Sequence, residues 1–210
     1  MASGLTIRVS ADIKRVTRGL DAVARKQLPF ATARAINDVA FDLMRAERAN
    51  VAKVLDHPRP FTQRSVGVPS KATKSKPTAA VAVRPEVAKY LAPFETGGRH
   101  HIPGRGIGLV VPKAVRLDQY GQLRGRPRAL GQRKNVFVGR VQTKDGLVDG
   151  FWQRMGGKKG GKLKLLARFE DALPVRKRLG FRTLAEREVR AKLPAALRQA
   201  IAKALATARR

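Results

Sequence analysis

Residues 29–55 read PFATARAINDVAFDLMRAERANVAKVL and carry a helical pattern that sets the architecture expected for this 210-residue chain. Apolar side chains at Ala33, Ile36 and Leu43 recur at helical spacing, so they share one face of an α-helix. After Leu55 the sequence continues towards HPRP, and two prolines in four residues cannot continue the hydrogen-bond ladder of a helix. The pattern therefore predicts a long helix that ends near Leu55 and buries one apolar face.

The segment before residue 29 carries a related pattern. Apolar residues recur at helical spacing at Ile13, Val16, Leu20 and Val23. Pro29 lacks a backbone donor and disfavours a helical conformation at Leu28. We therefore expect one helix that ends near Gln27 and a second that starts at Pro29, the alternative being one long kinked helix. Still earlier, residues 5–9 alternate apolar and polar side chains, which predicts a short strand.

The C-terminal part of the chain carries a second helical pattern. Apolar residues follow each other at steps of four from Ala185 through Val189, Leu193, Leu197 and Ile201 to Leu205. This spacing predicts a helix from about Thr183 to Ala208 with one apolar face. Thr183 and Glu186 have the spacing of a capping box. Pro194 interrupts the pattern, so we expect a kink or a break near Lys192.

The middle of the chain changes to strand-like patterns separated by segments rich in Gly, Pro and basic residues. Strands are predicted at residues 65–68, 79–83, 108–111, 135–141, 150–154 and 163–169. A helical turn is expected at Phe61 and a short turn or helix at residues 86–91. Residues 69–77 form either a basic hairpin loop or a flexible flap. Neither residues 124–134 nor residues 155–162 resemble core, because basic residues dominate both.

Together these patterns predict an α+β fold in which long N-terminal and C-terminal helices pack on an antiparallel sheet. The whole chain, residues 1–210, is expected to form a single domain. Long basic loops are expected near residues 69–77, 95–107, 123–134 and 155–162. Six apolar residues are expected in helix packing or in a subunit interface: Ile36, Leu43, Val189, Leu193, Leu197 and Ile201.

The charge of the chain points to an anionic partner. Lys and Arg number 45 against 15 Asp and Glu, for a formal net charge of +30. Such an excess repels itself unless DNA or an acidic protein surface lies nearby, and charge alone does not separate these two partners. A charge run is often only solvated surface, but the size of this excess favours an interaction role. The predicted contact residues are Lys71, Lys74, Lys76, Arg124, Arg126, Arg128, Arg133, Lys134, Lys158, Lys159 and Lys162.

No residue pattern predicts catalysis or a bound cofactor. His100 and His101 are adjacent in a Gly- and Pro-rich segment without the spaced third ligand that a metal site needs. The carboxylates of Asp145, Asp149 and the pair at 170–171 are read as local partners of basic residues. Cysteine is absent, which excludes disulfides and thiolate ligands. We therefore expect a protein that is not an enzyme and that holds no metal, no cofactor and no small-molecule substrate.

The sequence also lacks the pattern of a membrane protein. Residues 1–10 carry no signal-peptide apolar stretch, and no run approaches the roughly 20 apolar residues of a membrane span. We expect the protein to be made and used in the cytoplasm. Because aromatic residues make up only 5% of the chain and are scarce in the basic loops, recognition of single-stranded bases by stacking is disfavoured.

Two segments carry a family resemblance. Residues 28–40 (LPFATARAINDVA), with their Ala-Ile-Asn element, resemble the amino-terminal helix of the minor tail protein Z family of lambda-like phages and prophages. Residues 172–181 (ALPVRKRLGF), followed by a basic amphipathic helix, resemble the end of these proteins. The resemblance implies a structural virion protein of the tail or neck that completes the tail for head-tail joining and is assembled in the cytoplasm of the host bacterium.

The expected mechanism is assembly into a closed homo-oligomeric ring, with sixfold symmetry implied by the resemblance. Its partners would be other phage tail or neck proteins, with the DNA in the channel as a further contact. Two alternatives stay open. The first is a general nucleic-acid-binding protein of ribosomal or nucleoid type. The second is a metal-dependent nuclease, which requires His100, His101 and a carboxylate to converge.

Overall fold

The computed structural model describes residues 5–10, 22–101, 109–156 and 161–208. Its helices and antiparallel sheets confirm the α+β class. Where the sequence predicts a single domain, the chain divides into two compact units. The first unit combines Met1–Thr96 with Lys177–Arg210, and the second unit is Gly97–Arg176.

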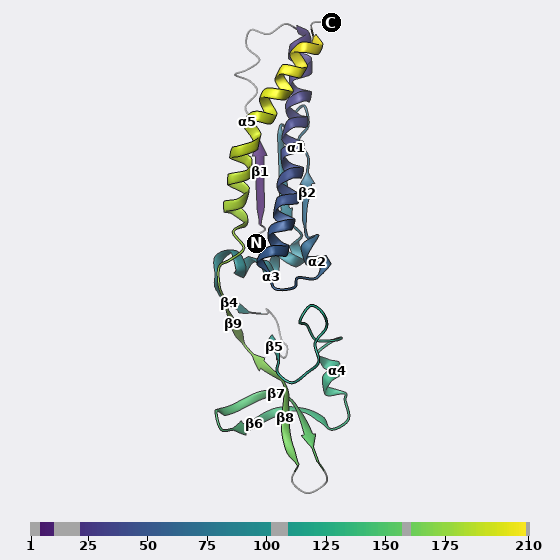
Figure 1. The fold of residues 1–210 in the computed structure, drawn as a ribbon, viewed down its shortest axis with the longest axis vertical. Coiled ribbons are helices and arrows are strands. Elements are labelled where there is room, and N and C mark those ends of the chain that lie inside the picture. Colours follow the sequence, from purple (N-terminus) through teal and green to yellow (C-terminus); the bar gives the residue numbers. More distant parts are fainter. Residues whose placement is uncertain (1–4, 11–21, 102–108, 157–160, 209–210) are drawn as a thin grey trace. The chain divides into compact units, whose positions relative to one another are not determined.

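The first unit is built from two long helices and a small sheet (Figure 1). The sheet has the order β1-β3-β2, and both pairings are antiparallel. The elements are β1 (Thr6–Ser10), α1 (Ala22–Val54), α2 (Pro60–Gln63), β2 (Val66–Ser70), β3 (Thr78–Val83), α3 (Pro85–Thr96) and α5 (Phe181–Ala208). The predicted strands at residues 5–9, 65–68 and 79–83 are therefore confirmed, as is the turn at Phe61.

Helix α1 continues through Pro29, so the predicted helix end near Gln27 is wrong. The proline removes one backbone hydrogen bond, but Leu28 beside it is fully buried and the buried face continues after it with Ala33 and Ile36. Tertiary packing thus outweighs the local preference at this position. The helix ends at Val54, as predicted, and His57 follows in a left-handed conformation with φ 46°. The predicted helical positions Ile13, Val16 and Leu20 lie outside the described residues.

Helix α5 begins at Phe181, two residues before the predicted start at Thr183. Its first turn is capped by α3, since a carboxylate oxygen of Glu95 accepts a hydrogen bond from the Phe181 amide at 2.8 Å. The other oxygen accepts one from the Arg182 amide at 3.2 Å. This cap replaces the predicted capping box. Pro194 lies within the helix, whose green and yellow parts run in different directions in Figure 1, so α5 bends without breaking.

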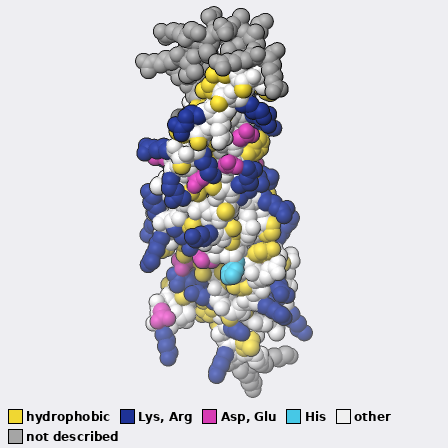
Figure 2. Space-filling model, turned by 45° about the horizontal axis from the view of Figure 1, so that its top comes forward, with side chains coloured by type: hydrophobic (Ala, Val, Ile, Leu, Met, Phe, Trp, Pro, Cys, Tyr) yellow, Lys and Arg dark blue, Asp and Glu magenta, His cyan; other side chains and the backbone are white. Residues whose placement is uncertain are grey.

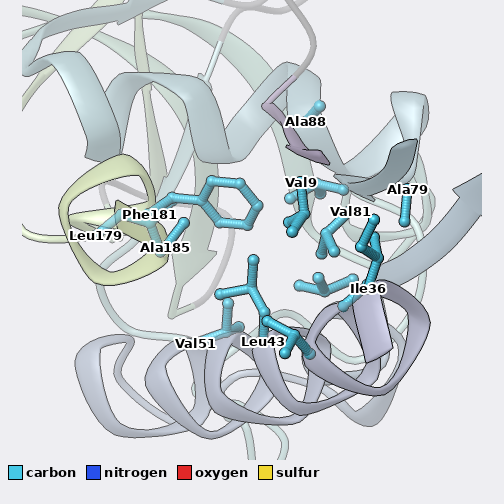
Figure 3. Packing of buried hydrophobic residues seen from close by; sticks show 14 of the residues in the cluster. Val9, Ile36, Leu43, Val51, Ala79, Val81, Ala88, Leu179, Phe181 and Ala185 are labelled. Carbon is cyan, nitrogen blue, oxygen red and sulfur yellow. The ribbon is translucent and has the colours of Figure 1, made fainter. Parts of the chain in front are cut away.

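The core of the first unit lies between α1, α5 and one face of the small sheet (Figure 3). Alternate residues of β3, Ala79, Val81 and Val83, are buried, which is the period of a strand with one covered face. Phe181 points from the first turn of α5 into this space, opposite the α1 side chains. The predicted packing residues Ile36 and Leu43 are both buried in this cluster.

The second unit consists mainly of strands. A four-stranded sheet has the order β5-β8-β7-β6, and β4 pairs with β9 in a separate two-stranded ribbon. Every pairing is antiparallel. The elements are β4 (Gly98–His101), β5 (Leu109–Pro112), α4 (Arg128–Gly131), β6 (Val136–Thr143), β7 (Gly146–Met155), β8 (Lys162–Glu170) and β9 (Ala172–Val175). The four strands predicted beyond residue 107 are found, distributed in one sheet.

Two segments of the second unit differ from expectation. Residues 95–107 were expected to be a loop, yet residues 98–101 form β4 by pairing with β9. Its sequence, Gly-Arg-His-His, has no apolar alternation that would predict a strand, and the strand is defined by its backbone pairing with β9. Residues 123–134 were not expected to be core, yet α4 places Leu130 in the buried cluster with Phe151, Leu166 and Ala167.

Close strand packing stabilises the core of the second unit. Phe151 and Phe169 meet edge to face with ring centroids 5.1 Å apart. Strand β8 lies so close to β7 that a Cβ atom at Gly150 would approach the Ala167 carbonyl oxygen to 2.2 Å. Only glycine fits at position 150.

Candidate functional site

The first basic segment is the β2–β3 hairpin loop, residues 71–77, and it is clasped to helix α1. Of the two alternatives, the structure shows a hairpin loop, because β2 and β3 pair antiparallel. Asn37 of α1 donates from Nδ2 to the Ala72 carbonyl oxygen at 3.0 Å. The Ala72 amide donates to Asn37 Oδ1 at 2.7 Å. Ala72 itself is buried, so the loop is anchored near its start.

Two lysines of this hairpin loop lie over aromatic rings of α1. The Lys71 Nζ is 5.4 Å from the centroid of the Phe41 ring, and the Lys74 Nζ is 5.4 Å from that of Phe30. Both ammonium groups are therefore positioned by cation–π contacts, and Lys76 is exposed beside them. The predicted contact residues Lys71, Lys74 and Lys76 thus form one basic cluster on the first unit.

Five aromatic rings of the described residues have a cation over one face. Besides the two lysine pairs, three guanidinium groups lie within 6 Å of a ring centroid: Arg84 over Phe61, Arg154 over Phe137 and Arg178 over Phe94. A ring face occupied by a guanidinium or an ammonium group is not open to a nucleobase. The expectation that bases are not recognised by stacking stays a prediction.

The second basic cluster surrounds α4. Arg124, Arg126, Arg128, Arg133 and Lys134 are all exposed, while Leu130 anchors the segment in the core. Lys162 is also exposed, at the start of β8, where it faces Met155 across the ladder. The predicted contacts Lys158 and Lys159 lie outside the described residues. The α4 cluster belongs to the second unit and the hairpin cluster to the first, so the predicted contact residues form separate groups.

The few carboxylates near basic residues pair locally. Three ion pairs have N–O distances of 2.9 to 3.3 Å: Arg140–Asp149 at 3.3 Å, Arg178–Asp56 at 3.1 Å and Lys192–Glu188 at 2.9 Å. Glu170 pairs with Arg168 of the same strand. Figure 2 accordingly shows Lys and Arg side chains spread over the visible face with few Asp and Glu among them. With 45 Lys and Arg against 15 Asp and Glu, the excess of 30 positive charges has no carboxylate in the chain to balance it.

The described residues contain no group of three His, Asp or Glu residues placed to hold a metal ion. His100 and His101 lie in β4, in register with Leu173 and Ala172 of β9. Asp145 lies in the β6–β7 turn, and Asp149 is engaged with Arg140.

Helices α1 and α5 pack along their length and leave a groove between them. Val189 and Leu193 pack against the core of the first unit, and Leu197 and Ile201 are half-buried further along α5. The groove has a volume of about 800 Å³. Alanines of α5 line one side and Phe30, whose side chain is 56% exposed, lies on the other.

A buried carboxyl group beneath α5 escaped the sequence analysis. Glu47 of α1 is fully buried, and among the described residues neither of its carboxyl oxygens has a hydrogen-bond partner of normal geometry. Burial raises the pKa of Glu47 to about 8, the Asn50 side chain opposes this rise, and the carboxylates of Glu95 and Glu188 add to it. Glu47 is therefore largely protonated at neutral pH. The sequence feature that could have revealed this burial is the position of Glu47 on the apolar face of the helix, four residues from both Leu43 and Val51.

No helix in the described part of the chain is both long and apolar enough to cross a membrane. Comparison of the chain with protein families, with curated proteins and with solved structures finds no match.

Proposed function

We propose that this protein is a structural component of a bacteriophage tail or neck that completes the tail for head-tail joining. The observation that carries the proposal is the uncompensated charge: 45 Lys and Arg stand against 15 Asp and Glu, and several of these carboxylates already pair with arginines and lysines of the same chain. Such a chain gains electrostatic free energy only against an anionic neighbour. The resemblance of residues 28–40 and 172–181 to the minor tail protein Z family is the reason for proposing the phage tail or neck as the assembly that the chain joins.

In this proposal, copies of the chain form a closed ring of six around the tail channel. The clusters at Lys71–Lys76 and around α4 meet acidic tail or neck subunits, or the DNA in the channel. The anchoring of both clusters by Asn37 and Leu130 supports such a role, since positioned charges lose less conformational entropy on binding. Neither an enzymatic step nor a bound small molecule is part of this function, and the site of action is the virion.

A deletion of the gene in the phage or prophage that encodes the chain tests this function. The expected result is filled heads and separate tails in the lysate, with joining restored when the gene is supplied in trans. Normal yields of joined, infectious particles from the deletion strain would contradict the proposal. Charge reversal of Lys71, Lys74 and Lys76 provides a matched variant, because these side chains are exposed or partly exposed and the Asn37 clasp is left intact.

The exposed arginines around α4 also support a second candidate, a general nucleic-acid-binding protein. Its phosphate contacts would release counterions, so its affinity for duplex DNA would fall steeply with salt. A fluorescence titration of the purified protein with duplex DNA at several salt concentrations distinguishes the two. Tight binding with a slope of several counterions favours this candidate. Weak binding at physiological salt favours the tail component.

A further inference from the structure

The edge strands of the described sheets differ in how far they are protected against pairing with another chain. Strand β2 contains Pro69 and an irregular register, and β5 has four residues and ends in Pro112. Strand β1 has five residues, and β9 of the ribbon contains Pro174. Short length, proline and register breaks are the usual devices that prevent an edge from acting as a template.

Strand β6 lacks all of these devices. It has eight residues, contains no proline and keeps an unbroken register with β7 from Val136 to Thr143. No described strand pairs with its other side, so it is the edge of the four-stranded sheet. Three valines and a phenylalanine give it a high preference for extended structure. On that side the Val136 amide already donates to the Arg133 carbonyl oxygen at 3.1 Å, and the backbone groups after Val136 are available for one more strand.

The side chains of β6 do little to repel an added strand. Arg140 is its single charged residue, and its guanidinium pairs with Asp149 of β7 at 3.3 Å. Val138 is 54% exposed and Leu147 is 64% exposed. The two side chains lie on the same face of the sheet, because Leu147 is in register with Gln142, which is four residues after Val138 in β6. Two large apolar side chains therefore lie open next to an open edge.

The charges around β6 identify the kind of chain that fits. Arg133 and Lys134 precede the strand, and Lys144 follows it in the turn, all three exposed. A second copy of β6 would bring these like charges together, which is unfavourable between neighbouring strands. An acidic strand would instead place its carboxylates against them and its alternate apolar side chains near Val138.

We propose that β6 is a docking edge that accepts an extended acidic segment of a partner protein as a fifth strand of the β5-β8-β7-β6 sheet. The main-chain hydrogen bonds supply most of the affinity, and the flanking basic residues select the acidic partner. The inference rests on the strand edge and its charges, so it holds whichever assembly the protein joins.

Synthetic peptides of about ten residues test the edge with the full-length protein. The probe alternates Val or Thr with Asp or Glu. One control replaces the acids by Lys, and another keeps the acids but has a central proline. We expect the acidic peptide alone to slow amide hydrogen exchange in residues 136–143. Equal effects of either control peptide, or no effect of the acidic one, would overturn the proposal. If residues 136–143 are protected without peptide, and this protection increases with protein concentration, the occupant is a second copy of the chain, and the proposal is overturned as well.

Two matched variants separate edge pairing from simple charge attraction. Val138→Glu puts a negative charge on the docking strand β6, whereas Leu147→Glu puts it on the same face of the neighbouring strand β7, opposite Gln142. Both positions are more than half exposed, so both variants should fold. We expect Val138→Glu to weaken binding of the acidic peptide about tenfold and Leu147→Glu by about threefold or less. Equal losses of affinity in the two variants would show that the peptide binds through surface charge, which would contradict the proposed docking edge.

Discussion

Asn37 holds Ala72 by both its backbone groups: Nδ2 donates to the Ala72 carbonyl oxygen at 3.0 Å, and the Ala72 amide donates to Oδ1 at 2.7 Å. One side chain on α1 thus fixes Ala72, the second residue of a basic hairpin loop, 35 residues further along the chain. The clasp explains why Lys71 and Lys74 can rest over rings of the same helix.

Replacing Asn37 by Ala should release the hairpin loop. Both hydrogen bonds are lost and the buried Ala72 backbone loses its partners, which costs about 1–3 kcal/mol of unfolding free energy. Hydrogen exchange should accelerate in residues 71–77, and urea unfolding should show the loss. Asp38→Ala is the matched control, since Asp38 is the exposed neighbour. Unchanged exchange in the loop of Asn37→Ala would mean that other contacts hold it.

Glu95 should stabilise α5 more than Glu186 does. Glu95 accepts two amide hydrogen bonds at the first turn of α5 and places a negative charge at the positive end of the helix. Glu95→Gln should cost about 0.5–2 kcal/mol in thermal or urea unfolding. Glu186→Gln, at the exposed position of the predicted capping box, should cost less. A larger loss of stability for Glu186→Gln than for Glu95→Gln would show that the Thr183–Glu186 capping box, and not Glu95, caps α5.

The buried carboxyl group of Glu47 should make the first unit less stable as pH rises. Its pKa is about 8 in the folded chain against an ordinary value of 4.5. Below pH 4.5 both states are protonated, and between these values only the unfolded chain releases the proton. Unfolding free energy should therefore fall by up to about 1.4 kcal/mol per pH unit in this window and level off above it.

Urea unfolding of the wild type and of Glu47→Gln between pH 5 and pH 8.5 measures this contribution. The glutamine keeps the shape but does not titrate, so the difference between the two proteins isolates Glu47 from other groups. We expect the variant to gain stability relative to the wild type as pH rises. Parallel curves would show that Glu47 is ionised in the folded protein.

Leu193 and Leu197 should respond differently to an introduced carboxylate. Leu193 is partly buried against the core of the first unit, so Leu193→Asp should lower the unfolding free energy of that unit. Leu197 is half-buried near the groove, so Leu197→Asp should leave a folded chain that fails to assemble. Circular dichroism measures folding and mass photometry measures assembly, with Arg198→Asp as the exposed control. A Leu197→Asp protein that assembles normally would remove this part of α5 from the subunit interface.

The helical faces could be predicted from the sequence because periodicity reports burial directly. Ile36, Leu43 and Ala185 occupy the predicted faces and are buried. Whether a proline interrupts a helix was harder to predict. The sequence shows that a proline removes a backbone hydrogen bond, but it does not show the tertiary packing that offsets this loss. Pro29 and Pro194 both lie inside continuous helices.

The contacts that shape the candidate site depend on residues distant in sequence. Asn37 and Ala72, or Glu95 and Phe181, carry no pattern that links them, and β4 gains its strand only through β9. Exposure of the basic residues follows from composition, whereas their anchoring by Leu130 and Asn37 does not. The division into two units was not predicted, because the Gly- and Pro-rich residues 97–106 at the first boundary were interpreted as a loop within one domain and residues 176–177 carry no such composition.

Quantitative mass spectrometry of purified virions tests the central proposal most directly. Isotope-labelled reference peptides from α1 and from β7 give the number of copies of the chain per particle, with the portal protein of the same particles as the internal standard. A closed ring predicts a fixed stoichiometry of about six copies per virion, located in the tail fraction after heads and tails are separated. Absence of the chain from virions, or recovery only with host ribosomes or nucleoid, would contradict the proposal.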